Sequence, residues 1–262
     1  DGVLLLLPGG PGGNGIWLPA LMPLVLPEVA ERYQFVSLDP RGTGADALDC
    51  PAVQAQVGMS DLLAATPEAI EECAARLGPR AAQQSTAATV ADLEALRVAL
   101  GIDDWVLDST SYGTFVAQRY AVAHPGAVRA LVLDSLVPVS GVDPFLLTSM
   151  GAVPRVLADV CAAEGCDVDP PAAIEQILAA GYPALDLLNA LVTTSVIDPA
   201  FTGVLDSLAD AAAGELAGLD GLVARAEQIA TSSTLRAFSS GAHIATLCAD
   251  TPMPWGGADR TV

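Results

Sequence analysis

The chain has 262 residues, of which 52% are hydrophobic and only 16% are charged, with 24 Gly and 19 Pro. This composition is typical of a globular protein with a well-buried core and argues against a disordered or fibrous chain. The formal net charge of −20 argues against nucleic acid or an anionic membrane as a partner, and no apolar stretch reaches the roughly 20 residues of a membrane-spanning helix.

Short apolar runs alternate with helical patterns through the first 137 residues. Strands are expected near residues 3–7, 34–38, 105–108 and 130–134, with helices near 18–32, 89–100 and 112–124. This alternation predicts an α/β fold with a mostly parallel sheet and crossover helices. An excursion over residues 50–86 is expected to carry one amphipathic helix near 67–77. Because a domain seldom begins with a buried strand, we also expect missing upstream sequence, including any export signal.

The pattern changes after about residue 140. No further convincing strand follows, and Ala/Leu-rich helical segments are separated by Pro, Gly and Asp. Helices are expected near residues 154–163, 171–179, 183–192, 203–217, 219–230 and 233–248. The sequence therefore predicts two domains, an α/β core over residues 1–139 and an inserted all-helical domain over residues 140–262.

The segment Ser109-Thr110-Ser111-Tyr112-Gly113 joins a predicted strand to a predicted helix. A serine on a sharp strand-to-helix turn, followed by glycine two residues later, is typical of a nucleophile elbow. Ser111 is therefore the candidate nucleophile, and Gly113 permits the close approach of helix and strand. The alternative is a turn serine with no chemical role.

A glycine-rich run, Pro8-Gly9-Gly10-Pro11-Gly12-Gly13, follows the first predicted strand. Such a run forms a loop with exposed backbone N–H groups. In an oxyanion hole, one donor is the N–H after the nucleophile and the other comes from a strand-to-helix loop of this kind. These donors are assigned to Tyr112 and Gly10. A phosphate-binding loop is the alternative, but the chain has no lysine to complete one.

The second predicted strand ends in Asp39-Pro40-Arg41-Gly42-Thr43-Gly44. Asp39 and Arg41 are interpreted as structural residues near the site, which fix this loop through ion pairing and backbone hydrogen bonds.

Five cysteines are present, and none has the spacing of a zinc site, so no metal and no cofactor are expected. We expect disulfides between Cys50 and Cys73 and between Cys161 and Cys166, with Cys248 left over. Disulfides favour a secreted or periplasmic protein. Buried free thiols in a cytosolic enzyme are the alternative.

Several of these motifs together resemble the prolyl and tripeptidyl aminopeptidase family of α/β-hydrolases. They are the Gly-Gly-Pro-Gly loop, the Asp39-to-Gly44 segment with Cys50 shortly after it, Ser111-Tyr112-Gly113-Thr114, Ser85-Thr86 followed by Asp92-Leu93-Glu94, Val132-Leu133-Asp134, and Ile244-Ala245 with Cys248-Ala249-Asp250. The resemblance implies an α/β-hydrolase fold with a helical cap and a serine exopeptidase that removes residues from the free N-terminus of short peptides. In two departures, Pro8 replaces a frequent histidine and Ser109 replaces the usual glycine.

The remaining members of a catalytic triad are not evident. In this fold the order is Ser, then Asp or Glu, then His, and the only histidines are His124 at a helix end and His243 in a helical context. The Asp and His are therefore expected beyond residue 262, so that the given chain is an inactive fragment of a complete enzyme. The resemblance implies that cap carboxylates bind the substrate amine, and the candidates are Asp159, Glu164, Asp198, Asp206, Asp210 and Asp250.

Two other functions remain open. One is an esterase or lipase-like hydrolase on the same fold, and the other is a catalytically inactive, hydrolase-like binding protein. The sequence does not specify an oligomeric state.

Overall fold

The computed structural model describes residues 2–139, 147–198 and 200–250. Its contacts divide the chain into two compact units. In the described residues, unit 1 comprises 2–59, 65–139 and 233–250, and unit 2 comprises 60–64, 147–198 and 200–232. The domain boundary expected after residue 139 falls at the segment 140–146, outside the described residues.

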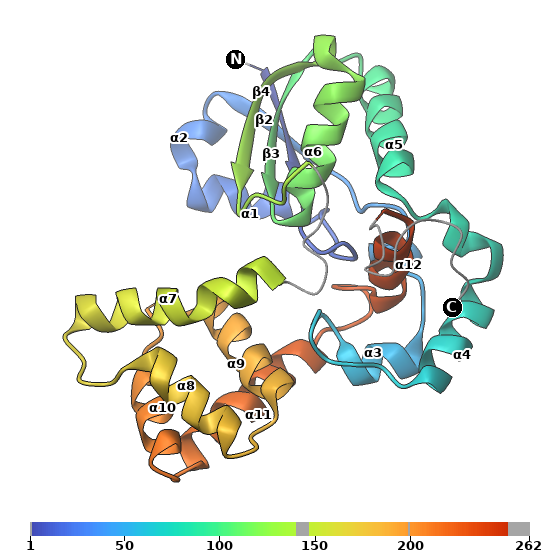
Figure 1. Cartoon of the computed structure of the whole chain (residues 1–262). Helices are drawn as coiled ribbons and strands as arrows, with labels where there is room; N and C mark the ends of the chain where they lie inside the picture. The colour runs from blue at the N-terminus through green and yellow to red at the C-terminus, as the bar shows by residue number, and fades with distance from the viewer. Residues whose placement is uncertain (1, 140–146, 199, 251–262) are drawn as a thin grey trace. The chain divides into compact units, whose positions relative to one another are not determined.

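A four-stranded parallel sheet forms the centre of unit 1 (Figure 1). Its strands are β1 (Gly2–Leu7), β2 (Tyr33–Ser37), β3 (Trp105–Thr110) and β4 (Val128–Asp134), in the order β2-β1-β3-β4. The predicted α/β fold with a parallel sheet is confirmed, and each of the four predicted strands is present. The carboxyl ends of β1 and β3 are in register, with Leu7 paired to Ser109, so the loops after these strands leave the same edge.

Helices cover both faces of the sheet. Alternate residues of β1 point to opposite sides, and leucines on both sides pack against helices. Leu5 and Leu7 pack in a core cluster with residues of α5 (Thr86–Ala99) and α6 (Tyr112–Ala123). Leu4 and Leu6 pack on the other face against residues of α1 (Leu18–Val25) and α2 (Pro27–Ala30). The sequence predicted a single helix over 18–32, but the structure has two. Helical backbone is unfavourable for a residue that precedes proline, and Leu26, which precedes Pro27, has φ −128° and ψ 64°.

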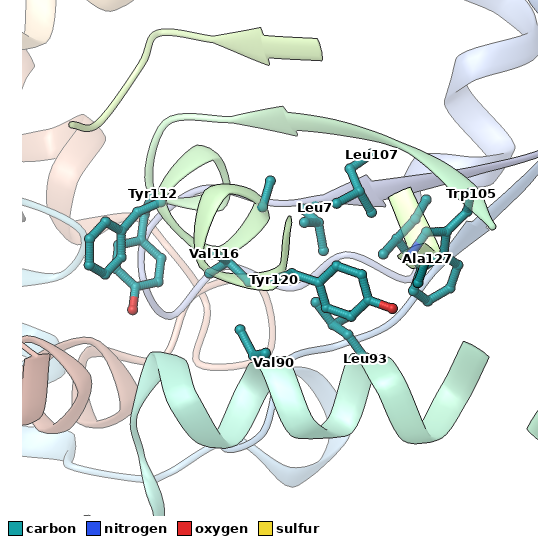
Figure 2. Close-up of a cluster of buried hydrophobic side chains, with 12 residues drawn as sticks. Leu7, Val90, Leu93, Trp105, Leu107, Tyr112, Val116, Tyr120 and Ala127 are labelled. Atoms are coloured by element: carbon teal, nitrogen blue, oxygen red, sulfur yellow. The ribbon is translucent and has the colours of Figure 1, made fainter. Parts of the chain in front are cut away.

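The larger core cluster fixes α6 against the sheet (Figure 2). Trp105 and Tyr120 are both fully buried, and their ring centroids lie 5.8 Å apart. Burial of an apolar side chain of this size contributes about 1.5–3 kcal/mol. The helix that follows Ser111 is therefore held firmly along its length.

A polar network adds to this packing between α5 and α6. Tyr120 Oη donates to Glu94 Oε2 at 2.6 Å, and Arg97 donates to both carboxylate oxygens of Glu94. Hydrogen bonds from Arg97 and Tyr120 lower the pKa of Glu94 to about 2. The ionised carboxylate is therefore favoured in the folded state.

The excursion after β2 holds two short helices, α3 (Pro51–Val57) and α4 (Pro67–Leu77), and the 3-10 turns η1 (Gly44–Asp46) and η2 (Gly78–Gln83). Helix α4 has the limits expected from the sequence, whereas α3 was not predicted because two turns of helix give too little periodic signal. Cys50 and Cys73 form a disulfide that ties the start of α3 to α4. This is the pairing that the sequence led us to expect.

Unit 2 is built from five helices in its described residues: α7 (Leu147–Glu164), α8 (Pro170–Ala179), α9 (Ala184–Ile197), α10 (Val204–Ala212) and α11 (Ala217–Thr231). Fully buried Leu157, Val204 and Leu208 belong to its own core cluster. The second expected disulfide, Cys161 to Cys166, ties the end of α7 to the loop before α8. No helix in the described part of the chain is long and apolar enough to cross a membrane.

The last helix, α12 (Ser240–Asp250), belongs to unit 1 and contacts α3. The sequence grouped it with the helical domain and started it at residue 233. Residues before Ser240 instead pair with the glycine-rich loop, since Asn14 N donates to Ala237 O and Gly13 forms an antiparallel bridge with Phe238. These long-range hydrogen bonds explain the later start of the helix and its place in unit 1.

The Glu94 network predicts a pH-dependent contribution to stability. The carboxyl pKa is about 4.3 in an unfolded chain and about 2 here, so the contribution is full above about 4.3 and is lost as pH falls through 2. Glu94→Gln is expected to lower the melting temperature at pH 7 by several degrees, with the difference vanishing near pH 2. Glu72→Gln, which breaks an exposed i,i+4 pair with Arg76, is the control and should have little effect. An equal effect of Glu94→Gln at both pH values would contradict this prediction.

Candidate active site

Ser111 lies on the turn between β3 and α6 in a strained backbone conformation, with φ 54° and ψ −125°. Positive φ in a residue other than glycine costs about 1–3 kcal/mol and persists only where surrounding contacts enforce it. Here Ser111 N donates to Asp134 O at 2.9 Å, and Thr114 N and Thr114 Oγ1 both donate to Ser111 O. Ser111 is partly exposed, so the turn presents its side chain without burying it.

Glycines allow the first turn of α6 to approach the end of β1. A Cβ atom on Gly113 would lie 2.6 Å from Leu7 O and 2.8 Å from Pro8 O, which are backbone atoms that cannot move aside. Gly9 also lies close to the turn, since a Cβ on it would be 3.1 Å from Ser111 Cβ and 3.6 Å from Ser111 Oγ. The structure therefore brings the glycine-rich loop beside the candidate nucleophile.

The two residues expected to supply oxyanion donors lie on this loop and at this turn. Gly10 has φ +125°, and a Cβ there would lie 2.7 Å from Gly12 N and 2.9 Å from Gly13 N, so the loop folds tightly upon itself. Tyr112 is the first residue of α6. Its N–H has no partner within the helix, and the positive end of the helix dipole favours a developing negative charge there.

The Tyr112 side chain is buried in a hydrogen-bonded cluster that the sequence did not predict. Its hydroxyl contacts Thr86 Oγ1 and donates to Asp250 Oδ2 at 3.0 Å. The same carboxylate oxygen accepts from Thr86 N at 2.7 Å and Thr86 Oγ1 at 2.6 Å. Burial raises the pKa of the Tyr112 phenol above its usual range, so the hydroxyl keeps its proton and acts as a donor.

Asp39 and Arg41 hold neighbouring loops. Asp39 Oδ1 accepts from Gly15 N at 2.9 Å and Ile16 N at 3.0 Å, just before α1. Arg41 forms a bidentate pair with Asp92 on α5, with contacts of 2.8 and 2.7 Å, and also donates to Gln83 O and Ala88 O. Bidentate arginine–carboxylate pairs fix orientation as well as distance. The two residues do not pair with each other, but both have contacts suited to holding loops.

The sequence profile of the alpha/beta hydrolase fold family matches residues 2–155 of this chain. The chain belongs to this family. Similar proteins include a tripeptidyl aminopeptidase of Streptomyces lividans, 34% identical over 52% of this chain and 29% of that protein. Serine protease Hip1 of Mycobacterium tuberculosis is 32% identical over 66% of this chain and 38% of that protein.

A probable proline iminopeptidase of Streptomyces coelicolor is 30% identical over 69% of this chain and 49% of that protein. The matched region therefore spans less than half the length of each of these three relatives. Their names agree with the resemblance that the sequence motifs indicate.

Both departures from the usual α/β-hydrolase motif are accommodated. Ser109 is 1% exposed, and its hydroxyl donates to Val132 O on β4 at 2.9 Å. A buried hydroxyl that is hydrogen-bonded costs little. Pro8 lies at the start of the loop and close to Gly15, since a Cβ added to Gly15 would lie 3.2 Å from Pro8 Cδ. The turn at Ser111 is thus present with serine at position 109 and proline at position 8.

Neither histidine lies on a loop that directly follows a strand. His124 follows the C-terminal end of the 12-residue helix α6, roughly 18 Å along the helix from Ser111, and its ring contacts Tyr120. His243 is buried in α12 and its Nδ1 lies 2.7 Å from Pro11 O. A carbonyl oxygen only accepts, so Nδ1 carries the proton and donates to the glycine-rich loop.

Three of the six candidate amine-binding carboxylates have protein partners. Asp159 pairs with Arg155, Asp198 accepts from the N–H groups of Ala200 and Thr202, and Asp250 accepts from Thr86 and Tyr112. Asp206 lines a hollow of about 620 Å³ within unit 2. No group of His, Cys, Asp and Glu among the described residues is arranged to hold a metal ion.

A cavity of about 30 Å³ lies behind the elbow, lined by residues that include Leu7, Gly9, Tyr112 and Gly113. This volume holds about one water molecule and is too small for a substrate.

Gly113→Ala tests the close approach of α6 to β1. Helix propensity alone predicts that alanine stabilises the protein by about 1 kcal/mol. Overlap with the Leu7 and Pro8 carbonyls predicts a loss of about 1–3 kcal/mol, which outweighs that gain. We expect a lower urea midpoint, whereas Gly126→Ala, where a Cβ meets no atom within 4 Å, is the control and should change it little. A stabilised Gly113→Ala variant would show that α6 does not approach the Leu7 and Pro8 carbonyls this closely.

Proposed function

We propose that the protein is a serine hydrolase that cleaves residues from the N-terminus of short peptides through an acyl-enzyme at Ser111. The observation that carries this proposal is the strained, partly exposed Ser111 beside the glycine-rich loop. A strained backbone conformation persists only where surrounding contacts hold it, and such strain is frequent at active sites. Here the hydrogen bonds of Ser111 with Asp134 and Thr114 hold it.

In the proposed reaction, Ser111 Oγ attacks the scissile carbonyl carbon as a base removes the hydroxyl proton. The carbonyl oxygen becomes an oxyanion, stabilised by the N–H groups of Gly10 and Tyr112. The amine leaves with the proton from the base, and an ester forms at Ser111. Water, activated by the same base, then attacks the ester carbon; the bond to Ser111 Oγ breaks, the acyl group leaves as a carboxylate, and the base returns a proton to the serine oxygen.

The base and its orienting carboxylate are proposed to be a His and an Asp encoded beyond residue 262. The positions of His124 and His243 support this, since one lies at the far end of α6 and the other contacts Pro11. Residues 1–262 alone are therefore proposed to show no useful turnover. No cofactor is required by this reaction.

The substrate proposal is supported by the names of the similar proteins, which include aminopeptidases and an iminopeptidase. Unit 2 is proposed to act as the helical cap, with carboxylates that bind the substrate ammonium group. Disulfides at Cys50–Cys73 and Cys161–Cys166 support a secreted or periplasmic location, because such bonds persist in oxidising compartments.

Labelling with a fluorophosphonate probe tests the nucleophile in the full-length protein. The serine oxygen bonds to phosphorus and fluoride leaves, so a labelled protein is expected for the natural sequence and none for Ser111→Ala. Ser135→Ala is the matched control, because Ser135 is also a positive-φ serine after a strand but is exposed and hydrogen-bonds to Asp134. Labelling that survives Ser111→Ala would overturn the assignment.

A substrate panel separates the proposed peptidase from the alternatives. We expect the full-length protein to hydrolyse aminoacyl and peptidyl arylamides with a free N-terminus. Acetylation of that terminus removes the ammonium charge and leaves the carboxylates that bind it without a partner, so kcat/KM is expected to fall by at least about 100-fold. A preference for short acyl esters would favour an esterase. Binding of peptides without labelling or turnover would favour an inactive binding protein.

A further inference from the structure

Helix α12 and the residues just before it contact both elements that carry the proposed oxyanion donors. Its N-terminal part lies against the glycine-rich loop, and its last residue, Asp250, lies against Tyr112. These contacts link positions that are 232 and 138 residues apart in sequence. The helix therefore joins the two sides of the proposed oxyanion hole.

The contacts at the N-terminal part hold the loop through its backbone. Ser239 N donates to Gly12 O at 2.9 Å, and His243 Nδ1 donates to Pro11 O at 2.7 Å. The approach leaves no room for a side chain, since a Cβ on Gly12 would lie 2.7 Å from Ser239 O and 3.2 Å from His243 Cβ. The carbonyl of Pro11, one residue after Gly10, is thus fixed by a buried side chain.

The contacts at the C-terminal end hold the helix that follows the nucleophile. Asp250 Oδ2 accepts from Tyr112 Oη and from both the N–H and the hydroxyl of Thr86. Thr86 is the first residue of α5, so one carboxylate oxygen joins the starts of α5 and α6. Hydrogen bonds to an ionised acceptor are about twice as strong as those between neutral groups.

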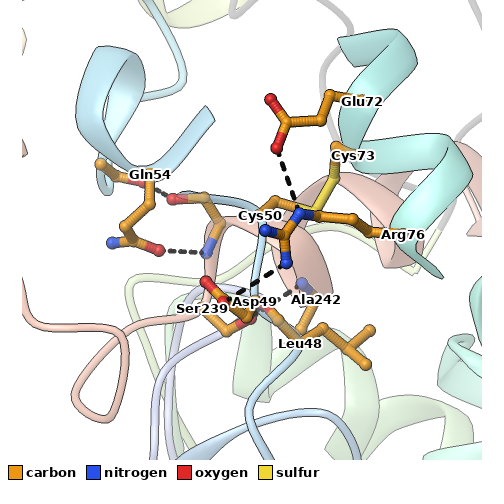
Figure 3. Close-up of a disulfide and its surroundings, with 11 residues drawn as sticks. Leu48, Asp49, Cys50, Gln54, Glu72, Cys73, Arg76, Ser239 and Ala242 are labelled. Atoms are coloured by element: carbon orange, nitrogen blue, oxygen red, sulfur yellow. Dashed lines mark hydrogen bonds and ion pairs between the residues drawn. A yellow bond between two sulfur atoms is a disulfide. The ribbon is translucent and has the colours of Figure 1, made fainter. Parts of the chain in front are cut away.

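The helix is itself anchored to the disulfide-bonded excursion (Figure 3). Ser239 Oγ donates to Leu48 O at 2.8 Å and accepts from Ala242 N at 3.0 Å. Ser240 N donates to Gln54 Oε1, and a Cβ on Gly241 would lie 2.6 Å from Leu48 O and 3.1 Å from Cys50 Sγ. These contacts therefore fix the position of the start of α12 next to Cys50.

We propose that α12 sets the separation of the two oxyanion donors, with His243 positioning the Gly10 N–H and Asp250 positioning the Tyr112 N–H. This inference rests on the proposed function, because it needs an oxyanion to form at Ser111. Both residues act through a neighbour: His243 through Pro11 O, and Asp250 through the Tyr112 hydroxyl. Asp250 is thereby assigned to the catalytic framework and not to the substrate ammonium group.

The test compares transition-state binding with ground-state binding in the full-length protein. A peptide aldehyde that adds to the serine forms an oxyanion-like hemiacetal, whereas the product peptide does not. We expect His243→Ala and Asp250→Ala each to lower kcat and aldehyde affinity about tenfold or more, because removal of a whole oxyanion donor costs about 100-fold or more. KM and product affinity should change by less than about threefold.

Conservative variants and a double mutant show whether each residue acts through its contact. His243→Asn, which can still donate near the Nδ1 position, should recover part of the loss. Tyr112→Phe removes the hydroxyl that Asp250 accepts from, so Asp250→Ala combined with Tyr112→Phe should be little worse than the more impaired single variant.

Ser240→Ala is the control for general weakening of α12, because Ser240 is fully buried and its hydroxyl donates to Gly58 O, which belongs neither to the glycine-rich loop nor to α6. Its aldehyde affinity should match that of the natural sequence. The proposal is overturned if folded Asp250→Ala or His243→Ala keeps full aldehyde affinity, or if Ser240→Ala loses as much aldehyde affinity as they do. It is also overturned if Asp250→Ala raises KM and leaves kcat unchanged, which is the result expected for a residue that binds the substrate ammonium group. A natural sequence that neither labels nor turns over would overturn the proposed function and this inference with it.

Discussion

The close approach of the first turn of α6 to the end of β1 is the constraint on which the site depends. The carbonyl oxygens of Leu7 and Pro8 lie 2.6 and 2.8 Å from where a Cβ on residue 113 would be, so glycine lets the two elements approach this closely without a clash. On the same turn, Ser111 has a positive φ that hydrogen bonds with Asp134 and Thr114 hold, and Gly9 lies against the serine side chain. The apolar core under α6 holds the helix in place, because Trp105 and Tyr120 are fully buried between the sheet and the helices.

A second layer of contacts surrounds this turn and the glycine-rich loop. Asp39 holds the end of that loop through Gly15 and Ile16, and Arg41 joins the neighbouring loop to α5. Helix α12 adds contacts at Pro11 and at Tyr112. These charged and polar residues therefore hold the loops and helices around Ser111 in place.

The sequence predicted those features that have a local signal. Short apolar runs predicted the four strands, and this signal holds for the central strands β1 and β3, which are mostly buried, and for the edge strands β2 and β4, which are more exposed. The segment from Ser109 to Gly113 has turn chemistry that is recognisable within five residues, and its strand-turn-helix context is present. The two disulfide pairs were also expected from the sequence and are present.

Features set by contacts between distant segments were missed. Helix α12 has the same Ala-rich character as the helices of unit 2, and its place in unit 1 depends on hydrogen bonds to Gly12, Leu48 and Pro11. The cluster of Thr86, Tyr112 and Asp250 joins three helices that no periodicity relates, although the motifs containing these residues were noted as a resemblance. Short helix α3 was missed because two helical turns carry little periodic pattern, whereas the break at Leu26 has a local signal in Pro27 that the single predicted helix did not use.

A crystal structure of the full-length protein after reaction with a fluorophosphonate would test both the nucleophile and the two oxyanion donors. We predict phosphorus bonded to Ser111 Oγ and a phosphonyl oxygen about 2.7–3.1 Å from the N atoms of both Gly10 and Tyr112. An adduct on another residue, or a phosphonyl oxygen that points away from these two N–H groups, would contradict it.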